Sequence, residues 1–237
     1  MSNKRIDLWR VSLSNIIDEN SPIENYSDYD TLVWCEFDEM YHLPKFVTRC
    51  MAGGIKPVCG VAFKLKTPEA CLTDALCVVC YAEDEEGTSE LEFLYSRCDE
   101  DGIKYEDFCK FSNHLQVGLD LILDEIEMLA IESILETVFV PDFVLIDLNQ
   151  NSFRSWKKCQ KFLEDNNVLI CGSSFPMSRS LSDEEVLEDF DFLGDKAYEY
   201  VIENPRKIAD RISGNYKFDV SLIEEIEDKR EEWRCTF

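Results

Sequence analysis

The residue types that carry most enzyme chemistry are unevenly represented in this chain. Its 237 residues include 49 aspartates and glutamates and eleven cysteines, but only two histidines, His42 and His114. Phosphoesterases that hold two or three metal ions need several neutral imidazoles together with carboxylates. Two histidines do not supply such a site, and we expect both of them in ordinary surface or core positions.

Cys77 and Cys80 have the C-x-x-C spacing of a redox pair or of half a zinc site. They lie within the apolar run Ala75–Ala82, which predicts a strand, and residues three apart on a strand point to opposite faces. No helix N-terminus, which would activate a thiol, is expected there. We interpret them, like Cys59 and Cys171 in other apolar runs, as small buried residues of a cytoplasmic protein without disulfides.

Three acids stand near expected strand ends, namely Asp7, Glu36 and Asp147. Their oxygens could bind a weak Mg²⁺ ion, but with 49 acids in the chain we attribute this placement to chance. The sequence has no G-x-S-x-G motif, and its nine glycines form no phosphate-binding loop of the Walker or Rossmann type. We therefore expect neither a catalytic residue nor a cofactor.

The charge balance is strongly acidic. The chain has 24 lysines and arginines against 49 acids, a formal net charge of −25, which repels nucleic acid and favours a basic protein partner. Its apolar runs are too short for a membrane helix, so we expect no membrane association. The candidate partner contacts are one basic helical patch and two aromatic residues near the C-terminus: Arg154, Lys157, Lys158, Lys161, Trp233 and Phe237.

Apolar runs and helical spacing divide the chain into strands and helices. The expected strands are Ile6–Leu13, Thr31–Phe37, Lys56–Leu65, Ala75–Ala82, Leu115–Ile122, Asp142–Leu148 and Val168–Cys171. The expected helices are Met40–Gly53, Thr88–Cys98, Tyr105–Phe111, Asp124–Glu136, Ser152–Asp165 and Val220–Phe237. This alternation is typical of βαβ units and predicts a parallel sheet that closes into an α/β barrel.

We expect one main domain, residues 1–213, followed by an acidic helical tail, residues 214–237. The tail has apolar residues at helical spacing from Val220 onwards. Its helix either packs back on the barrel or extends from it to bind a partner, and the sequence leaves both readings open.

Several segments resemble, in the same order, the PHP (polymerase and histidinol phosphatase) domain of bacterial replicative DNA polymerases. AGGIKPVCG at 52–60 is similar to the AGIKPIIG segment of that family, and DFVLIDL at 142–148 is similar to its DFYLEL strand. YEDFCKFSNHL at 105–115 resembles its helix-and-strand segment that ends in EGL. FLG at 192–194, followed by NPRKIAD at 204–210, is similar to the segment after the PHP core in the C-type polymerase of Gram-positive bacteria.

The resemblance covers roughly residues 6–213 and implies a distorted seven-stranded (β/α) barrel with its site at the carboxyl ends of the strands. The family holds its metals with an H-x-H motif, a T-D-H motif, a glutamate after the G-I-K-P strand and a late N-D-x-H motif. In this chain the matching positions are Asp7, Glu36, Phe37, Ala62, Ser173, Ser174 and Pro176. The resemblance thus implies a vestigial site from which the histidines have been lost.

We therefore expect a pseudoenzyme that acts as a protein-interaction or regulatory module. The resemblance suggests a link to DNA replication, and the charge suggests inhibition of a basic DNA-binding partner. The alternatives are a weak metal-dependent phosphoesterase, built on Glu36 and neighbouring acids, and a small-molecule binder that uses the mouth of the barrel.

Overall fold

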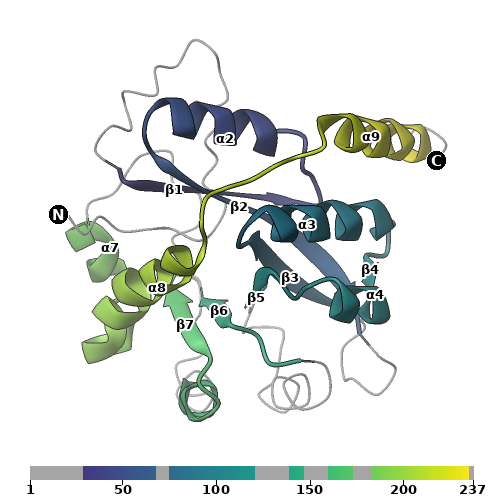
Figure 1. The fold of residues 1–237 in the computed structure, drawn as a ribbon. Coiled ribbons are helices and arrows are strands. Elements are labelled where there is room, and N and C mark those ends of the chain that lie inside the picture. Colours follow the sequence, from purple (N-terminus) through teal and green to yellow (C-terminus); the bar gives the residue numbers. More distant parts are fainter. Residues whose placement is uncertain (1–28, 68–74, 121–138, 147–159, 173–182, 235–237) are drawn as a thin grey trace.

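A mixed β-sheet curls into a half-barrel that packs against helices (Figure 1). This computed structural model describes residues 29–67, 75–120, 139–146, 160–172 and 183–234. The strands are β1 (Thr31–Phe37), β2 (Lys56–Lys66), β3 (Ala75–Ala82), β4 (Ile103–Lys104), β5 (Leu115–Asp120), β6 (Phe143–Ile146) and β7 (Leu169–Gly172). The helices are α2 (Leu43–Ala52), α3 (Glu85–Arg97), α4 (Tyr105–Lys110), α7 (Asp183–Asp189), α8 (Asn204–Arg211) and α9 (Val220–Arg234), with a 3₁₀ segment (Asp191–Lys196) and a π-helical turn (Glu199–Glu203) between α7 and α8.

The strand directions correct the prediction of a purely parallel sheet. The strand order is β1-β2-β3-β5-β6-β7, and β4 pairs separately with β2. The pairs β1-β2, β5-β6 and β6-β7 are parallel, but β3 is antiparallel to both β2 and β5. Only residues 67–74 join β2 to β3, and a parallel crossover needs a dozen or more residues. The short connection therefore forces β3 to run back along β2.

The sheet has two buried faces because most of its strands are apolar at every position. On β1, Leu32 and Trp34 belong to the core that packs under α2, α3 and α9, and we call this side the outer face. Val33 and Cys35 belong to a second core that includes Ile208 of α8, and we call this side the inner face. Residues with opposite parity on a strand thus meet different surroundings.

Two glycines make room for aromatic rings on the inner face. A Cβ atom on Gly60 would lie 2.5 Å from the ring of Tyr81, and one on Gly118 would lie 2.2 Å from the ring of Phe143. The two rings stack on each other with centroids 6.0 Å apart. The interior of the half-barrel is therefore filled by side chains that the strand glycines accommodate.

The segment between α8 and α9 crosses the outer face between α2 and α3 (Figure 1). It is tied down by Tyr216, whose hydroxyl accepts a 3.1 Å hydrogen bond from the backbone N–H of Cys59. Asp219 then caps α9 by accepting a 3.1 Å hydrogen bond from the backbone N–H of Leu222. On α9, Ile223 and Ile226 are buried in the outer core. The tail helix thus packs on the body of the molecule.

Most predicted elements within the described residues are confirmed, with ends that shift by a few residues. The predicted strand Ile6–Leu13 and helix Asp124–Glu136 lie outside the described residues. So does most of the predicted helix Ser152–Asp165, although its last residues, 160–165, are helical. No helix in the described ranges is long and apolar enough to span a membrane.

Candidate functional site

The carboxyl end of β1 lies beside the middle of β2, with Phe37 paired to Ala62, and β2 continues to Lys66. Phe37 is 43% exposed, whereas Ala62 is completely buried. Alternation along β2 puts Lys64 on the same face as Ala62, and Lys64 pairs across the strands with the half-buried Cys77. At the carboxyl end of β1, where barrel enzymes place catalytic groups, the paired positions Phe37 and Ala62 therefore present an exposed phenyl ring and a buried methyl group.

Glu36 precedes Phe37 and therefore points to the outer face, away from Ala62. Only 9% of Glu36 is exposed, and burial raises the pKa of its carboxyl from 4.5 to about 7. The carboxylates of Glu39 and Glu227 raise this pKa further, while the nearby Trp34 side chain lowers it. Below neutral pH, Glu36 is therefore largely a neutral acid enclosed by helices.

Two polar atoms in this buried region are not satisfied. Within the described part of the chain, Glu36 Oε2 and Trp34 Nε1 have no hydrogen-bond partner. The indole is near enough to lower the Glu36 pKa, but the two groups are not aligned for a hydrogen bond of normal geometry. An unsatisfied buried polar group costs about 1–3 kcal/mol, so this cluster reduces the stability of the fold.

Arg230 of α9 holds the loop after β1. Its guanidinium donates to the backbone oxygen of Asp38 at 2.8 Å and to the Asp38 carboxylate at 3.1 Å. It also donates to the backbone oxygen of Cys98 at 3.1 Å and lies 4.1 Å from the ring centroid of Tyr95. The Tyr95 hydroxyl donates to Glu227, which lies one turn before Arg230 on α9. These contacts fix α9 against both α3 and the end of β1.

Asp38 is held in an unusual backbone conformation at this point. Its φ angle is 53°, in the left-handed region that few residues other than glycine, asparagine and aspartate adopt. The backbone N–H of Asp38 donates to the backbone oxygen of Ala62 at 2.9 Å. The chain thus turns sharply after β1, and Arg230 binds the outside of that turn.

Two hollows lie on the surface beside the first turn of α2. The first is a groove between α2 and α9, with a volume of about 270 Å³. Its described lining consists of Tyr41, His42, Pro44, Lys45, Val220, Ile223 and Glu224. We call it the α2–α9 groove.

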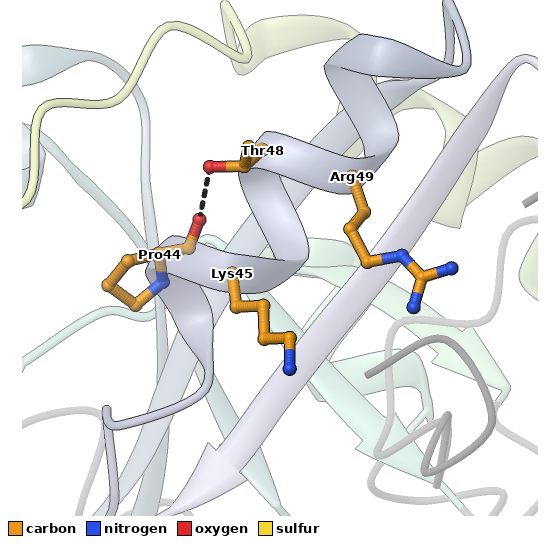
Figure 2. A pocket seen from close by; sticks show the side chains of 4 residues that line it. All are labelled: Pro44, Lys45, Thr48 and Arg49. Carbon is orange, nitrogen blue, oxygen red and sulfur yellow. Dashed lines mark hydrogen bonds between the residues drawn. The ribbon is translucent and has the colours of Figure 1, made fainter. Parts of the chain in front are cut away.

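The second hollow lies along the exposed side of α2 and has a volume of about 530 Å³ (Figure 2). It is lined by Pro44, Lys45, Thr48 and Arg49, and the Thr48 hydroxyl donates to the Pro44 backbone oxygen at 2.9 Å. Lys45 and Arg49 lie one turn apart, but neither is a free cation, because both have interactions within the chain. The open shape and the engaged cations make it a weak candidate for a binding site.

The structure does not gather the sequence-predicted site residues into one place. Glu36 and Phe37 lie on opposite faces of β1, and Ala62 sits beside Phe37. Lys161 is exposed near the end of its helix, and Trp233 lies on α9. The other candidates lie outside the described residues: Asp7, Asp147, Arg154, Lys157, Lys158, Ser173, Ser174, Pro176 and Phe237.

The histidines and cysteines have structural surroundings where the structure describes them. His42 lies at the start of α2 against Trp34, with ring centroids 6.5 Å apart. His114 is half exposed, with its Nδ1 atom 3.7 Å from the Asp84 carboxylate. The described cysteines are free thiols, and Cys77 and Cys80 pack against different cores of the sheet. The described residues contain no group of three histidines, cysteines or acids that could hold a metal ion.

Sequence reasoning missed Arg230, Tyr41 and Val220. Arg230 belongs to a run of charged residues, KREE, that is typical of an exposed helix end. Its burial depends on Asp38 and Cys98, which are distant in sequence. The mixed apolar and charged residues at the start of α9 indicate that this helix packs against another surface. They do not indicate which surface that is.

Comparison with protein-family models finds no match, and comparison with curated proteins finds none either.

Proposed function

We propose that this chain is a catalytically inactive PHP-like domain, a distorted seven-stranded barrel that binds a basic protein. The observation that carries the proposal is the composition of the carboxyl end of β1 and of the β2 residue paired with it. Phe37 is exposed and Ala62 is buried there, and the acid of β1, Glu36, is turned to the opposite face. These positions match the metal-ligand motifs of the PHP resemblance, and they offer no ligand at the mouth of the half-barrel.

The net charge of −25 supports a basic partner. Such a charge attracts positively charged proteins and accelerates their association, and added salt weakens this steering. The resemblance to a polymerase domain makes a replication protein, or a DNA-binding protein whose DNA site this surface occupies, the partner that fits best. Direct binding of nucleic acid is disfavoured by the same charge.

Metal analysis tests the loss of catalysis. Protein purified without chelator and then supplied with Mn²⁺ or Zn²⁺ should show no stoichiometric metal and no hydrolysis of a model phosphodiester above the buffer rate. Two or three tightly bound equivalents, together with turnover, would show that the chain is a metal-dependent phosphoesterase and would refute the proposal.

Affinity capture at graded salt tests the binding function. A lysate passed over the immobilised protein should leave a basic protein bound at low salt and release it at moderate salt. The recovered protein should then bind the purified chain directly. A variant of the chain with similar size but reversed surface charge should not bind the recovered protein. Recovery of a small metabolite and of no protein would favour the small-molecule alternative.

A further inference from the structure

The α2–α9 groove combines exposed apolar groups with a buried floor. Tyr41 is 57% exposed and Val220 is 49% exposed, and both line the groove. Ile223, only 1% exposed, forms part of its base. Exposed aromatic and aliphatic groups around a concavity are the usual anchors of protein interfaces. A volume of about 270 Å³ is near the lower limit of ligand pockets, which suits one or two inserted side chains.

Acidic residues stand on or close to the segments that form the groove. Glu224 lines it directly, and the exposed Asp228 follows one turn later on α9, on the same side of the helix. Glu39, also exposed, lies two residues before Tyr41. Lys45 is the one cation among the described lining residues, and it is engaged within the chain. Lysines or arginines beside an inserted apolar side chain would therefore meet opposite charges.

The walls of the groove are held by contacts behind them. The ring of His42 packs between Tyr41 and Trp34, with centroids 5.2 Å and 6.5 Å away. On the other wall, the start of α9 is capped by Asp219, whose backbone N–H donates to Glu92 of α3. A groove with fixed walls loses little conformational entropy on binding.

We infer that the α2–α9 groove docks a segment of the partner protein in which an apolar side chain is flanked by lysines or arginines. The inference rests on the proposed binding function and assigns it a site. The apolar side chain contacts Tyr41, Val220 and Ile223, and the flanking cations contact Glu224, Asp228 and Glu39. Apolar burial provides affinity, and the charges set the rate and the specificity of association.

A defined peptide tests this inference. The probe is a fluorescein-labelled helical peptide with leucine and tryptophan one turn apart and lysines at the remaining exposed positions, followed by fluorescence anisotropy. We expect saturable one-to-one binding that weakens as salt is raised. One control peptide keeps the lysines but has serine in place of leucine and tryptophan, and a second has glutamate in place of lysine. Neither control should saturate at the concentrations that saturate the probe.

Variants of the chain locate the binding. Tyr41→Ala, Val220→Asp and Glu224→Lys should each weaken binding of the probe about tenfold or more, because each removes a contact or adds a repulsive one. The matched controls are Tyr198→Ala and Glu203→Lys, which alter an exposed tyrosine and an exposed glutamate near α8. They should leave the affinity within about twofold. Circular dichroism and thermal unfolding will show that all five variants are folded.

Three results would overturn the inference. Equal loss of affinity in the groove variants and in the control variants would show general attraction to an acidic surface. Unchanged affinity in all the groove variants would place the docking surface elsewhere, even if the capture experiment succeeds. Concentration-dependent dimerisation that Val220→Asp abolishes would show that a second copy of the chain occupies the groove. If no basic protein is captured from the lysate but the probe peptide still binds saturably, the proposed partner is refuted, whereas the groove stands as a docking site.

Discussion

Glu36 combines two properties that rarely coexist in a stable core: it is an acid, and one of its oxygens has no hydrogen-bond donor among the described residues. Burial raises its pKa from 4.5 to about 7. The folded chain therefore binds a proton more tightly than the unfolded chain does. The stability that this proton contributes is complete below pH 4.5 and is lost as the pH rises through 7.

We predict that Glu36→Gln stabilises the protein above neutral pH. At pH 8 the substitution removes a buried charge, and the free energy of unfolding should rise by about 1–3 kcal/mol, within the limit set by the pKa shift. At pH 5 the wild-type side chain is already neutral in the folded state, so the difference should be much smaller. Urea unfolding at the two pH values measures both quantities.

Glu39→Gln is the matched control for this prediction, because Glu39 is an exposed glutamate in the loop that follows β1. It should change the free energy of unfolding by less than about 0.5 kcal/mol at either pH. Equal effects of Glu36→Gln at pH 5 and pH 8 would show that the carboxyl of Glu36 is not titrating between them.

The sequence could not tell which face of β1 carries Glu36. The strand reads TLVWCEF, which is apolar on both sides, so alternation does not distinguish the inner face from the outer face. The resemblance placed Glu36 near a metal site, whereas the packing of Trp34 and Leu32 under the helices turns it outward. Tertiary contacts decided which face of the sheet carries Glu36, and the local sequence of the strand does not encode those contacts.

One side chain of α9 ties this helix to two separate loops. Arg230 is 7% exposed and makes hydrogen bonds to the backbone of Asp38 and Cys98 and to the Asp38 carboxylate. Burial lowers the pKa of this guanidinium, but the Asp38 carboxylate together with Tyr95 and Cys98 more than offsets that effect, and the pKa is raised overall. The group thus remains charged and satisfies acceptors from two separate loops.

We predict that Arg230→Met destabilises the protein by about 2–4 kcal/mol, because it leaves the buried backbone oxygens and the Asp38 carboxylate without their donor. Hydrogen exchange should become faster in α9 before it does in the central strands. Lys229→Met is the matched control, since Lys229 is exposed and pairs with the exposed Glu225 one turn away. Its effect should stay below about 0.5 kcal/mol. Equal effects of the two substitutions would contradict the assigned role of Arg230.

The sequence predicted where strands and helices form better than it predicted the direction in which neighbouring strands run. The run ALCVVCYA indicates a buried strand, and β3 forms there. The same run carries no information on whether it pairs parallel or antiparallel. The informative signal was the short connection at 67–74, which has no room for a crossover helix. The place where α9 packs was also hidden, because its partners α2 and α3 precede it by more than a hundred residues.

The whole molecule is organised around a filled interior. Tyr81 and Phe143 occupy the inner face above Gly60 and Gly118, and small residues such as Ala62 and Cys171 complete that core. Close packing of this kind tolerates little added volume. The inner face is therefore packed as a core in the middle of the half-barrel.

We predict that Gly118→Ala destabilises the protein by about 2 kcal/mol or more, because the new methyl group would lie 2.2 Å from the Phe143 ring, which is fixed by its neighbours. The double variant Gly118→Ala with Phe143→Leu should recover part of the loss, giving a coupling energy of about 1 kcal/mol. Thermal and urea unfolding of the two single variants and the double variant complete the cycle. If the changes in the free energy of unfolding were strictly additive, Gly118 would not be required to accommodate the Phe143 ring.

The two walls of the α2–α9 groove come from residues that a ribosome makes at very different times. Tyr41 and Pro44 are synthesised before β2, whereas Val220 and Glu224 follow every strand of the sheet. The groove cannot exist on a nascent chain until translation has passed Arg230, which holds α9 in place. A partner that needs both walls will therefore not bind chains that stop before α9, and its binding will report that synthesis and folding have both reached α9.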